Sequence, residues 1–421
     1  MSKKQFWLDV VLATLFIFGL MFVFTKVTTF KVFDIFDPVG EALGEMQMTD
    51  VVFSQLREDP IADERIVMVN IANESRASMA MMIDSISQHN PAVIGFDSFF
   101  LTPKEDTLGD IMLADAFSRV ENLVLVSKLI AAPDSEPGAE FKVDSVQYSW
   151  EFFNQYADAN AFATLDTRAK DQGDLKFCRQ FWPDMEVDGE RHVAFGVKLA
   201  QYLDSAAVEE FLARDHETEL INFKGNVLDY GATKFGTKYF ALDVPDVYLG
   251  NYVPEMIEGK IVIFAFLGNY LGDRKDFEDK FITPLNASYV GRTLPDMYGG
   301  VIHANIVSMI LSRDFIYYLD DKVENIIGII LALFNVALFS LIYRRIPKWY
   351  DGVTKLFQLV ELAGLLFLIV YVFDRYNFVL ELGLAFFAIA LSGDALEVFY
   401  GVVKNIFSKE GRRELFRTEN R

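Results

Sequence analysis

Four long apolar runs constrain this chain of 421 residues more than any other feature. One lies near the start, at 6–25, and three lie close together near the other end, at 324–343, 356–373 and 378–393. Runs of about 18–20 apolar residues are long enough to cross the hydrocarbon core of a bilayer as helices. About 300 residues of ordinary globular sequence separate the first run from the second. This layout predicts a membrane protein with one large domain on one side of the bilayer.

Basic residues beside the runs predict the orientation of the chain. Lys3 and Lys4 precede the first run, Arg344 and Arg345 follow the second, and six more Lys and Arg lie beyond the fourth. Because positive charge collects on the cytoplasmic side, both termini are expected in the cytoplasm. No small-residue cleavage site follows the first run, so we expect it to remain as an uncleaved anchor.

These features divide the sequence into four parts. We expect an N-terminal transmembrane anchor at 1–26, an extracytoplasmic domain at 27–322, a three-helix transmembrane region at 323–400 and a basic cytoplasmic tail at 401–421. The predicted location is the inner (cytoplasmic) membrane, with the large domain periplasmic or extracellular. The lipid bilayer is therefore the first expected partner.

The composition of the large domain excludes several classes of function. The 27–322 segment holds 49 Asp and Glu against 25 Lys and Arg, a net charge of −24. This acidic balance argues against binding to nucleic acid or to an anionic membrane surface. The chain has a single cysteine, Cys178, and four widely spaced histidines, so no metal-ligand spacing is present. We expect no metal and no cofactor.

Alternating strand and helix patterns open the large domain. Continuous β-branched runs at 65–71, 92–96 and 123–128 are typical of buried strands, and apolar residues recur at helical spacing at 75–88 and 107–119. Short links between these elements imply parallel pairing with right-handed crossovers. The sequence therefore predicts an α/β extracytoplasmic domain with a mostly parallel sheet, in addition to four transmembrane α-helices.

The rest of the domain carries weaker patterns. Helices are expected at 192–204 and 299–312, and Asp188-Gly189 is a hairpin signal. Residues Val51–Leu56 read as a strand, as do 219–223 and 261–267.

Several short sequence segments follow one another along the chain. They are TDVVFSQLR, RIVMVNIANES, NPAVIGFDSFF, LVLVSKL, EGKIVIFAFLGNYLGD, FITPL and GGVIHANIVSMIL, followed by three apolar runs. In this order they resemble the extracellular sensory domain of the CHASE type-two family (cyclase/histidine-kinase-associated sensory extracellular), over about 45–312; the match is poor at 133–215.

The resemblance implies an N-terminal anchor, a large sensor and three C-terminal spans. In relatives a cyclase, kinase or phosphodiesterase module usually follows, and the tail from Val402 is too short for one. We therefore expect the signal to pass to a separate membrane or cytoplasmic protein that carries the output. The resemblance defines no ligand and so assigns no binding residues.

Three residues of the large domain are candidate ligand contacts. Asp97 ends a predicted buried strand, and ligands of parallel sheets bind at those ends; the alternative is a carboxylate that caps a turn. Asp273 belongs to an acidic cluster with Asp276, Glu278 and Asp279, for which a solvated loop is the alternative to calcium binding. His303 is a candidate pH sensor; the alternative is a packing residue.

Carboxylates within the apolar runs are a separate group. Glu361 and Asn335 are expected to make polar contacts between helices or subunits, because ionisable groups in a bilayer usually face the bundle interior. Asp9, near the cytoplasmic end of the first run, is expected to reach the membrane interface.

The leading hypothesis is a membrane-anchored sensory or regulatory subunit that is not an enzyme, because no nucleophile–base pair with a recognisable spacing is present. One alternative is a structural accessory subunit of a larger envelope complex. Another is a proton- or ion-coupled membrane subunit, which rests on Glu361. The ligand, the partner and homo-oligomerisation are left open.

Overall fold

The computed structural model describes residues 3–28, 48–57, 61–132, 142–167, 176–228, 238–273, 275–286 and 294–404. The chain divides into two compact units. Gln47–Ile316 form the first, which we call the α/β unit, and Met1–Met46 with Tyr317–Arg421 form the second, which we call the helical unit.

A seven-stranded sheet forms the centre of the α/β unit. Every pairing in it is parallel except the one between β3 and β4, which confirms the predicted mostly parallel sheet. Its path is β10 (Phe240–Leu242), β1 (Ile66–Asn70), β11 (Ile261–Ala265), β2 (Val93–Asp97), β3 (Leu123–Ala131) and β4 (Val143–Gln147), with β5 (Ala159–Phe162) also paired to β3.

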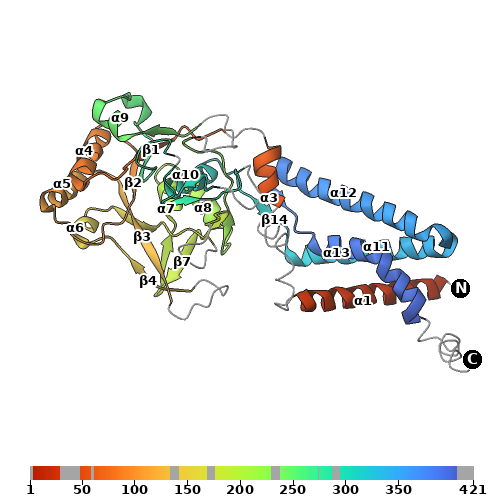
Figure 1. Ribbon diagram of the computed structural model, residues 1–421. Coiled ribbons are helices and arrows are strands. Elements are labelled where there is room, and N and C mark those ends of the chain that lie inside the picture. Colours follow the sequence, from red (N-terminus) through yellow and green to blue (C-terminus); the bar gives the residue numbers. More distant parts are fainter. Residues whose placement is uncertain are drawn as a thin grey trace, which may run out of the picture. The chain divides into compact units, whose positions relative to one another are not determined.

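Helices cover both faces of this sheet, as Figure 1 shows. One face carries α4 (Arg76–Ser87), α5 (Thr107–Ser118), α6 (Glu151–Asn154) and α9 (Val244–Leu249). The other carries α7 (Phe195–Gln201), α8 (Ser205–Leu212) and α10 (Gly299–Leu311). Strands β1 and β11 are buried along their whole length, as expected for strands covered on both faces.

Local sequence signals explain where the first helices begin. Ser75 caps α4 by accepting a hydrogen bond from the backbone N–H of Ser78, and Asp106 caps α5 in the same way from Gly109. The predicted helices at 75–88 and 107–119 are therefore confirmed to within a residue or two.

Other expectations need correction. The predicted hairpin forms between β7 (Asp184–Val187) and β8 (Glu190–Val193), with positive φ at Asp188 and Gly189. Because β8 takes up the start of the predicted 192–204 helix, α7 begins only at Phe195. The strand expected at Val51–Leu56 is wrong, since α3 (Met48–Val51) and a π-helical turn, η2 (Val52–Leu56), occupy this segment.

Short elements complete the described part of the α/β unit. They are β6 (Gln180–Phe181), β9 (Glu219–Leu220), η3 (Pro254–Met256), β12 (Lys280–Phe281) and β13 (Met297–Tyr298). The strand expected at 219–223 is therefore reduced to the two residues of β9.

Among the described residues of the helical unit, four helices are long and apolar enough to cross a membrane. They are α1 (Lys3–Thr28), α11 (Asp321–Arg345), α12 (Tyr350–Tyr376) and α13 (Gly383–Val398), which continues through the turn η5 (Phe399–Val403). The turn η4 (Pro347–Trp349) connects α11 to α12, and the two-residue strand β15 (Phe378–Val379) lies between α12 and α13. It pairs with β14 (Tyr317–Tyr318), which precedes α11. The one-plus-three layout agrees with the four apolar runs.

A close approach of α10 to the sheet gives a first prediction. A Cβ atom added at Gly300 would lie 2.3 Å from the Cβ of Ala265 in β11, so the helix packs against the strand only because Gly300 has no side chain. Gly300→Ala is expected to destabilise the α/β unit by about 1–3 kcal/mol, the usual cost of overpacking. Thermal unfolding of the detergent-solubilised chain measures this loss. Gly364→Ala, where a Cβ meets nothing within 4 Å, is the control and should not lower the melting temperature.

Candidate functional site

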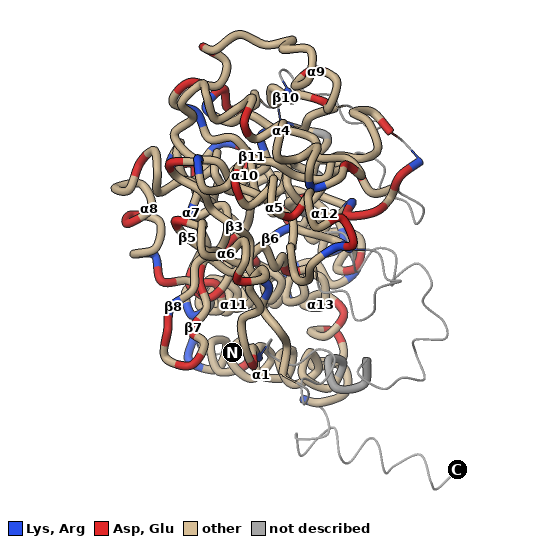
Figure 2. The backbone as a smooth tube through the Cα atoms, turned by 90° about the vertical axis from the view of Figure 1, so that its left-hand side faces the viewer, with Lys and Arg blue, Asp and Glu red and all other residues tan. Residues whose placement is uncertain are grey.

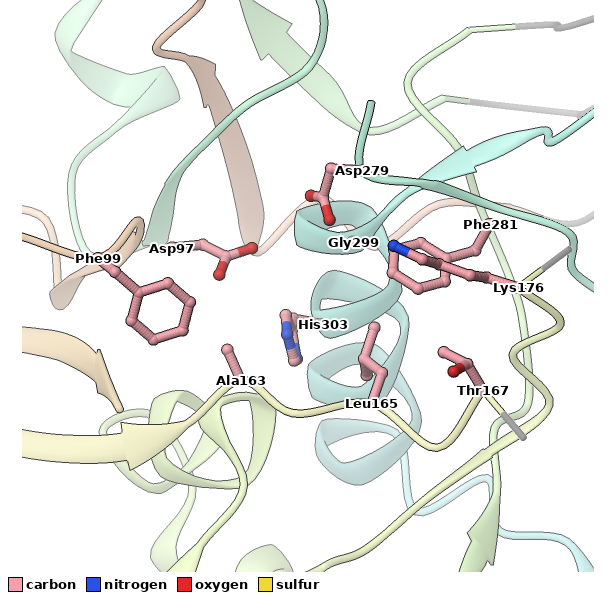
Figure 3. A pocket seen from close by; sticks show the side chains of 10 residues that line it. All are labelled: Asp97, Phe99, Ala163, Leu165, Thr167, Lys176, Asp279, Phe281, Gly299 and His303. Carbon is pink, nitrogen blue, oxygen red and sulfur yellow. The ribbon is translucent and has the colours of Figure 1, made fainter. Parts of the chain in front are cut away.

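A pocket of about 240 Å³ lies where strand β2 ends and helix α10 begins. Figure 3 shows the side chains that surround it. Its wall combines charged, polar and apolar residues from segments far apart in the sequence: Asp97, Phe99, Ala163, Leu165, Thr167, Lys176, Asp279, Phe281, Gly299 and His303. Parallel sheets of this kind bind ligands at the carboxyl ends of their strands, which is where the pocket lies.

Asp97 is the last residue of β2 and lies beside Ala265, the last residue of β11. Burial, together with the negative charge of Asp279, raises the pKa of the Asp97 carboxyl to about 8. At neutral pH this side chain therefore holds its proton and is both a donor and an acceptor of hydrogen bonds.

Asp279 faces Asp97 from the segment that precedes β12 (Figure 3). Its backbone has a positive φ of 55°, and its carbonyl accepts a 3.0 Å hydrogen bond from the Gly299 N–H. Burial raises the pKa of its carboxyl to about 6, and the positive charge of Lys176 opposes that rise. At neutral pH Asp279 is therefore mostly ionised.

The Gly299-Gly300 pair lets the start of α10 approach both carboxylates. A Cβ at Gly299 would lie 2.9 Å from Oδ2 of Asp279, and one at Gly300 would lie 3.4 Å from Oδ2 of Asp97. A side chain at Gly299 would therefore crowd the Asp279 carboxylate, whereas one at Gly300 would only come into contact with Asp97. The partial positive charge at a helix N-terminus also favours nearby carboxylates.

His303 lies one turn further along α10, with only 2% of its surface exposed. Its ring makes an edge-to-face contact with Phe195, with ring centres 5.3 Å apart, and forms a hydrogen bond with the backbone of Ala163. Nδ1 has no partner among the residues that the structure describes. Burial lowers the pKa of His303 to about 4, so the imidazole is neutral at physiological pH and does not titrate where a sensor of neutral pH would.

The structure brings Asp97 and His303 together but places Asp273 elsewhere. Asp273 accepts hydrogen bonds from the side chain of Asn269 (3.1 Å) and the backbone N–H of Lys275 (2.9 Å), and its carbonyl accepts one from Lys280 Nζ (2.9 Å). These contacts order the loop before β12, and Asp273 does not line the pocket. Within the acidic cluster, it is Asp279 that lines the pocket.

Lys176 and Asp279 are the charged residues of the pocket that sequence reasoning did not assign. Asp279 was recognised only as part of a charged loop, because nothing in its spacing shows which of four neighbouring carboxylates turns inward. Lys176 lies outside any strand or helix, so no periodic pattern marks it.

The polar residues of the helical unit form two groups. The Glu361 carboxylate on α12 forms a hydrogen bond with the side chain of Asn335 on α11. Asp9 is 6% exposed and pairs with the partly exposed Arg344 (2.8 Å) and Lys404 (2.5 Å).

No group of three His, Cys, Asp or Glu side chains suited to a metal ion is present among the described residues. The four apolar helices are those of a multi-pass membrane protein. The pocket in its α/β unit is a candidate ligand site.

The chain belongs to the CHASE2 domain family, a family of extracellular sensory domains. The family model matches residues 21–339, which include the whole α/β unit. No curated protein and no solved structure matches the chain significantly.

Proposed function

We propose that this protein is a membrane-anchored extracytoplasmic sensor whose ligand binds in the pocket formed by Asp97, Asp279, Lys176 and His303. The single observation that carries the proposal is a pair of carboxylates that line one pocket beside a buried imidazole with an unpartnered nitrogen, at the carboxyl end of a parallel sheet. Titratable groups with strongly shifted pKa values in a pocket are typical of functional sites. Membership of a sensory family supports the same function.

Helix α10 supplies a connection along the chain from this pocket to the spans. Its first residues line the pocket, and only residues 312–320 separate its end from α11. In our proposal a ligand that binds one packing of α10 more tightly than another shifts the population of that packing. In this proposal the shift in α10 alters how the four membrane-spanning helices pack against one another. A separate membrane or cytoplasmic partner converts that alteration into an output.

The extracytoplasmic placement belongs to the same proposal. The acidic surface supports it, since Figure 2 shows Asp and Glu spread over the loops and helices of the α/β unit, as on a well-hydrated domain. The proposed location is the inner membrane, with both termini cytoplasmic. Protease, or labelling of cysteines introduced on the surface because the native Cys178 is buried, should reach the α/β unit from the periplasmic side and spare the termini.

Ligand binding is tested by screening the full chain in detergent against a chemically unbiased metabolite library. A ligand of the folded state raises the melting temperature, by an amount that corresponds to about 2.7 kcal/mol at one hundred times its Kd. We expect at least one compound to stabilise the wild-type chain and to lose its effect on Asp97→Asn. Compounds that stabilise both chains equally, or a library with no stabilising compound, would contradict the proposal and favour a purely structural subunit.

The partner is tested separately by crosslinking in native membranes. We expect a second protein to be crosslinked to the chain and to co-purify with it in mild detergent. A clean monomer without crosslinked species would contradict this part of the proposal.

A further inference from the structure

The inference that follows rests on the proposed function and narrows the ligand of the same pocket. We propose that the pocket takes a small molecule with a primary ammonium group, bound between Asp97, Asp279 and His303.

Three hydrogen-bond acceptors converge on the pocket from three different elements. Asp97 comes from the end of β2, Asp279 from the segment before β12, and His303 from α10 (Figure 3). In the neutral imidazole only one nitrogen carries a proton. Because a hydrogen bond to the Ala163 backbone carbonyl uses that N–H, the unpartnered Nδ1 is an acceptor.

A primary ammonium group matches this arrangement in number and in charge. It has three N–H donors and no acceptor, so its donors match the acceptors of Asp97, Asp279 and His303 in number. Its positive charge also compensates two carboxylates that disfavour each other's ionisation. An anionic ligand would face both carboxylates, which opposes its binding at the start of α10.

The remaining walls limit the size and the second group of the ligand. A volume of about 240 Å³ is small for a ligand pocket and suits a molecule of a few heavy atoms. Phe99, Leu165 and Phe281 supply apolar surface, and Lys176 Nζ lies 5.5 Å from the ring centre of Phe281. Since the positive charge of Lys176, which acts on Asp279, also attracts a carboxylate, an amino acid should bind more tightly than the amine that lacks its carboxylate.

Ammonium binding should displace the proton of Asp97. The charged and titratable groups around the site are Asp97 on β2, Asp279 and Glu278 before β12, His303 on α10, and Lys176. Among these, only Asp97 has a raised pKa of about 8. Affinity for an ammonium ligand should therefore increase about tenfold from pH 6.5 to pH 8, with release of a proton to solvent.

The test uses the full chain in detergent and three classes of probe. The first class is ammonium compounds (ethanolamine, putrescine and a panel of small amino acids), the second is the uncharged ethylene glycol, and the third is the dianion succinate. Thermal shift and titration calorimetry at pH 6.5 and pH 8 measure binding. Asp97→Asn and His303→Leu test the site, and Asp115→Asn, an exposed carboxylate on α5, is the matched control.

We expect an ammonium probe to bind with the stated pH dependence, and its affinity to fall at least tenfold in Asp97→Asn and His303→Leu but not in Asp115→Asn. The inference is overturned if the ammonium probes leave the melting temperature unchanged at about 10 mM, or bind Asp97→Asn as tightly as wild type. If succinate or ethylene glycol binds in an Asp97-dependent manner instead, the inference fails while the proposed sensory function stands.

Discussion

Replacing Asp97 with Asn is expected to make the protein more stable above neutral pH while removing its ligand response. The wild-type carboxyl has a pKa of about 8 in the folded chain and about 3.8 when unfolded. The folded state therefore binds more protons than the unfolded state between these values, and stability falls as pH rises through this range. Asn keeps the shape of the side chain and has no proton to lose, so this part of the pH dependence disappears.

A narrow pH interval isolates this effect. The carboxyls of Asp279 and Asp296, with pKa values of about 6, and His303, with one of about 4, have their midpoints below this interval, so they add little to the change in stability across it. Between pH 6.5 and pH 8 the wild-type chain should lose up to about 2 kcal/mol that Asp97→Asn retains. Melting temperatures of both chains across this interval measure the difference. Parallel curves for the two chains would show that Asp97 is already ionised at neutral pH.

Replacing Arg76 with Met should cause a large loss of stability in the α/β unit. Arg76 of α4 and Asp110 of α5 form a 2.5 Å ion pair in which the two side chains are 6% and 5% exposed. Arg76 also donates a 2.8 Å hydrogen bond to the carbonyl of Thr102. Met fills much of the same volume but leaves the Asp110 carboxylate buried without its cation, which typically costs about 3–5 kcal/mol.

Two further variants separate charge from packing in this prediction. Arg119→Met, which removes two exposed pairs, with Asp84 and Asp115, should cost less than about 1 kcal/mol. The double variant Arg76→Met with Asp110→Leu should recover part of the loss, because no buried charge remains. If Arg76→Met and Arg119→Met cost the same in thermal unfolding, the buried pair does not stabilise the packing of α4 against α5.

Periodicity explains why the framework could be predicted from the sequence. The parallel strands are short β-branched runs buried on both faces, and α4 and α5 begin at Ser75 and Asp106, whose side chains cap them. The 51–56 segment misled the prediction because β-branched and apolar residues also suit a buried helical turn, and tertiary packing decides between the two.

The pocket was only partly predictable, for a different reason. Asp97 could be assigned because the end of a parallel strand is a position with a known geometry. His303 appeared as a lone residue on an apolar helix face, and only the fold shows that its turn of α10 lies beside Asp97. Asp279 depends on a backbone with positive φ, which no spacing in the acidic loop reveals.

The most direct test of the account is a high-resolution structure of the full chain purified gently from its native membrane. We predict density for a small molecule within the 240 Å³ pocket, in hydrogen-bonding contact with Asp97, Asp279 and Nδ1 of His303. The same preparation of Asp97→Asn should show the pocket without it. A ligand bound elsewhere in the α/β unit, with only water between Asp97 and His303, would contradict the assignment of this pocket as the sensory site.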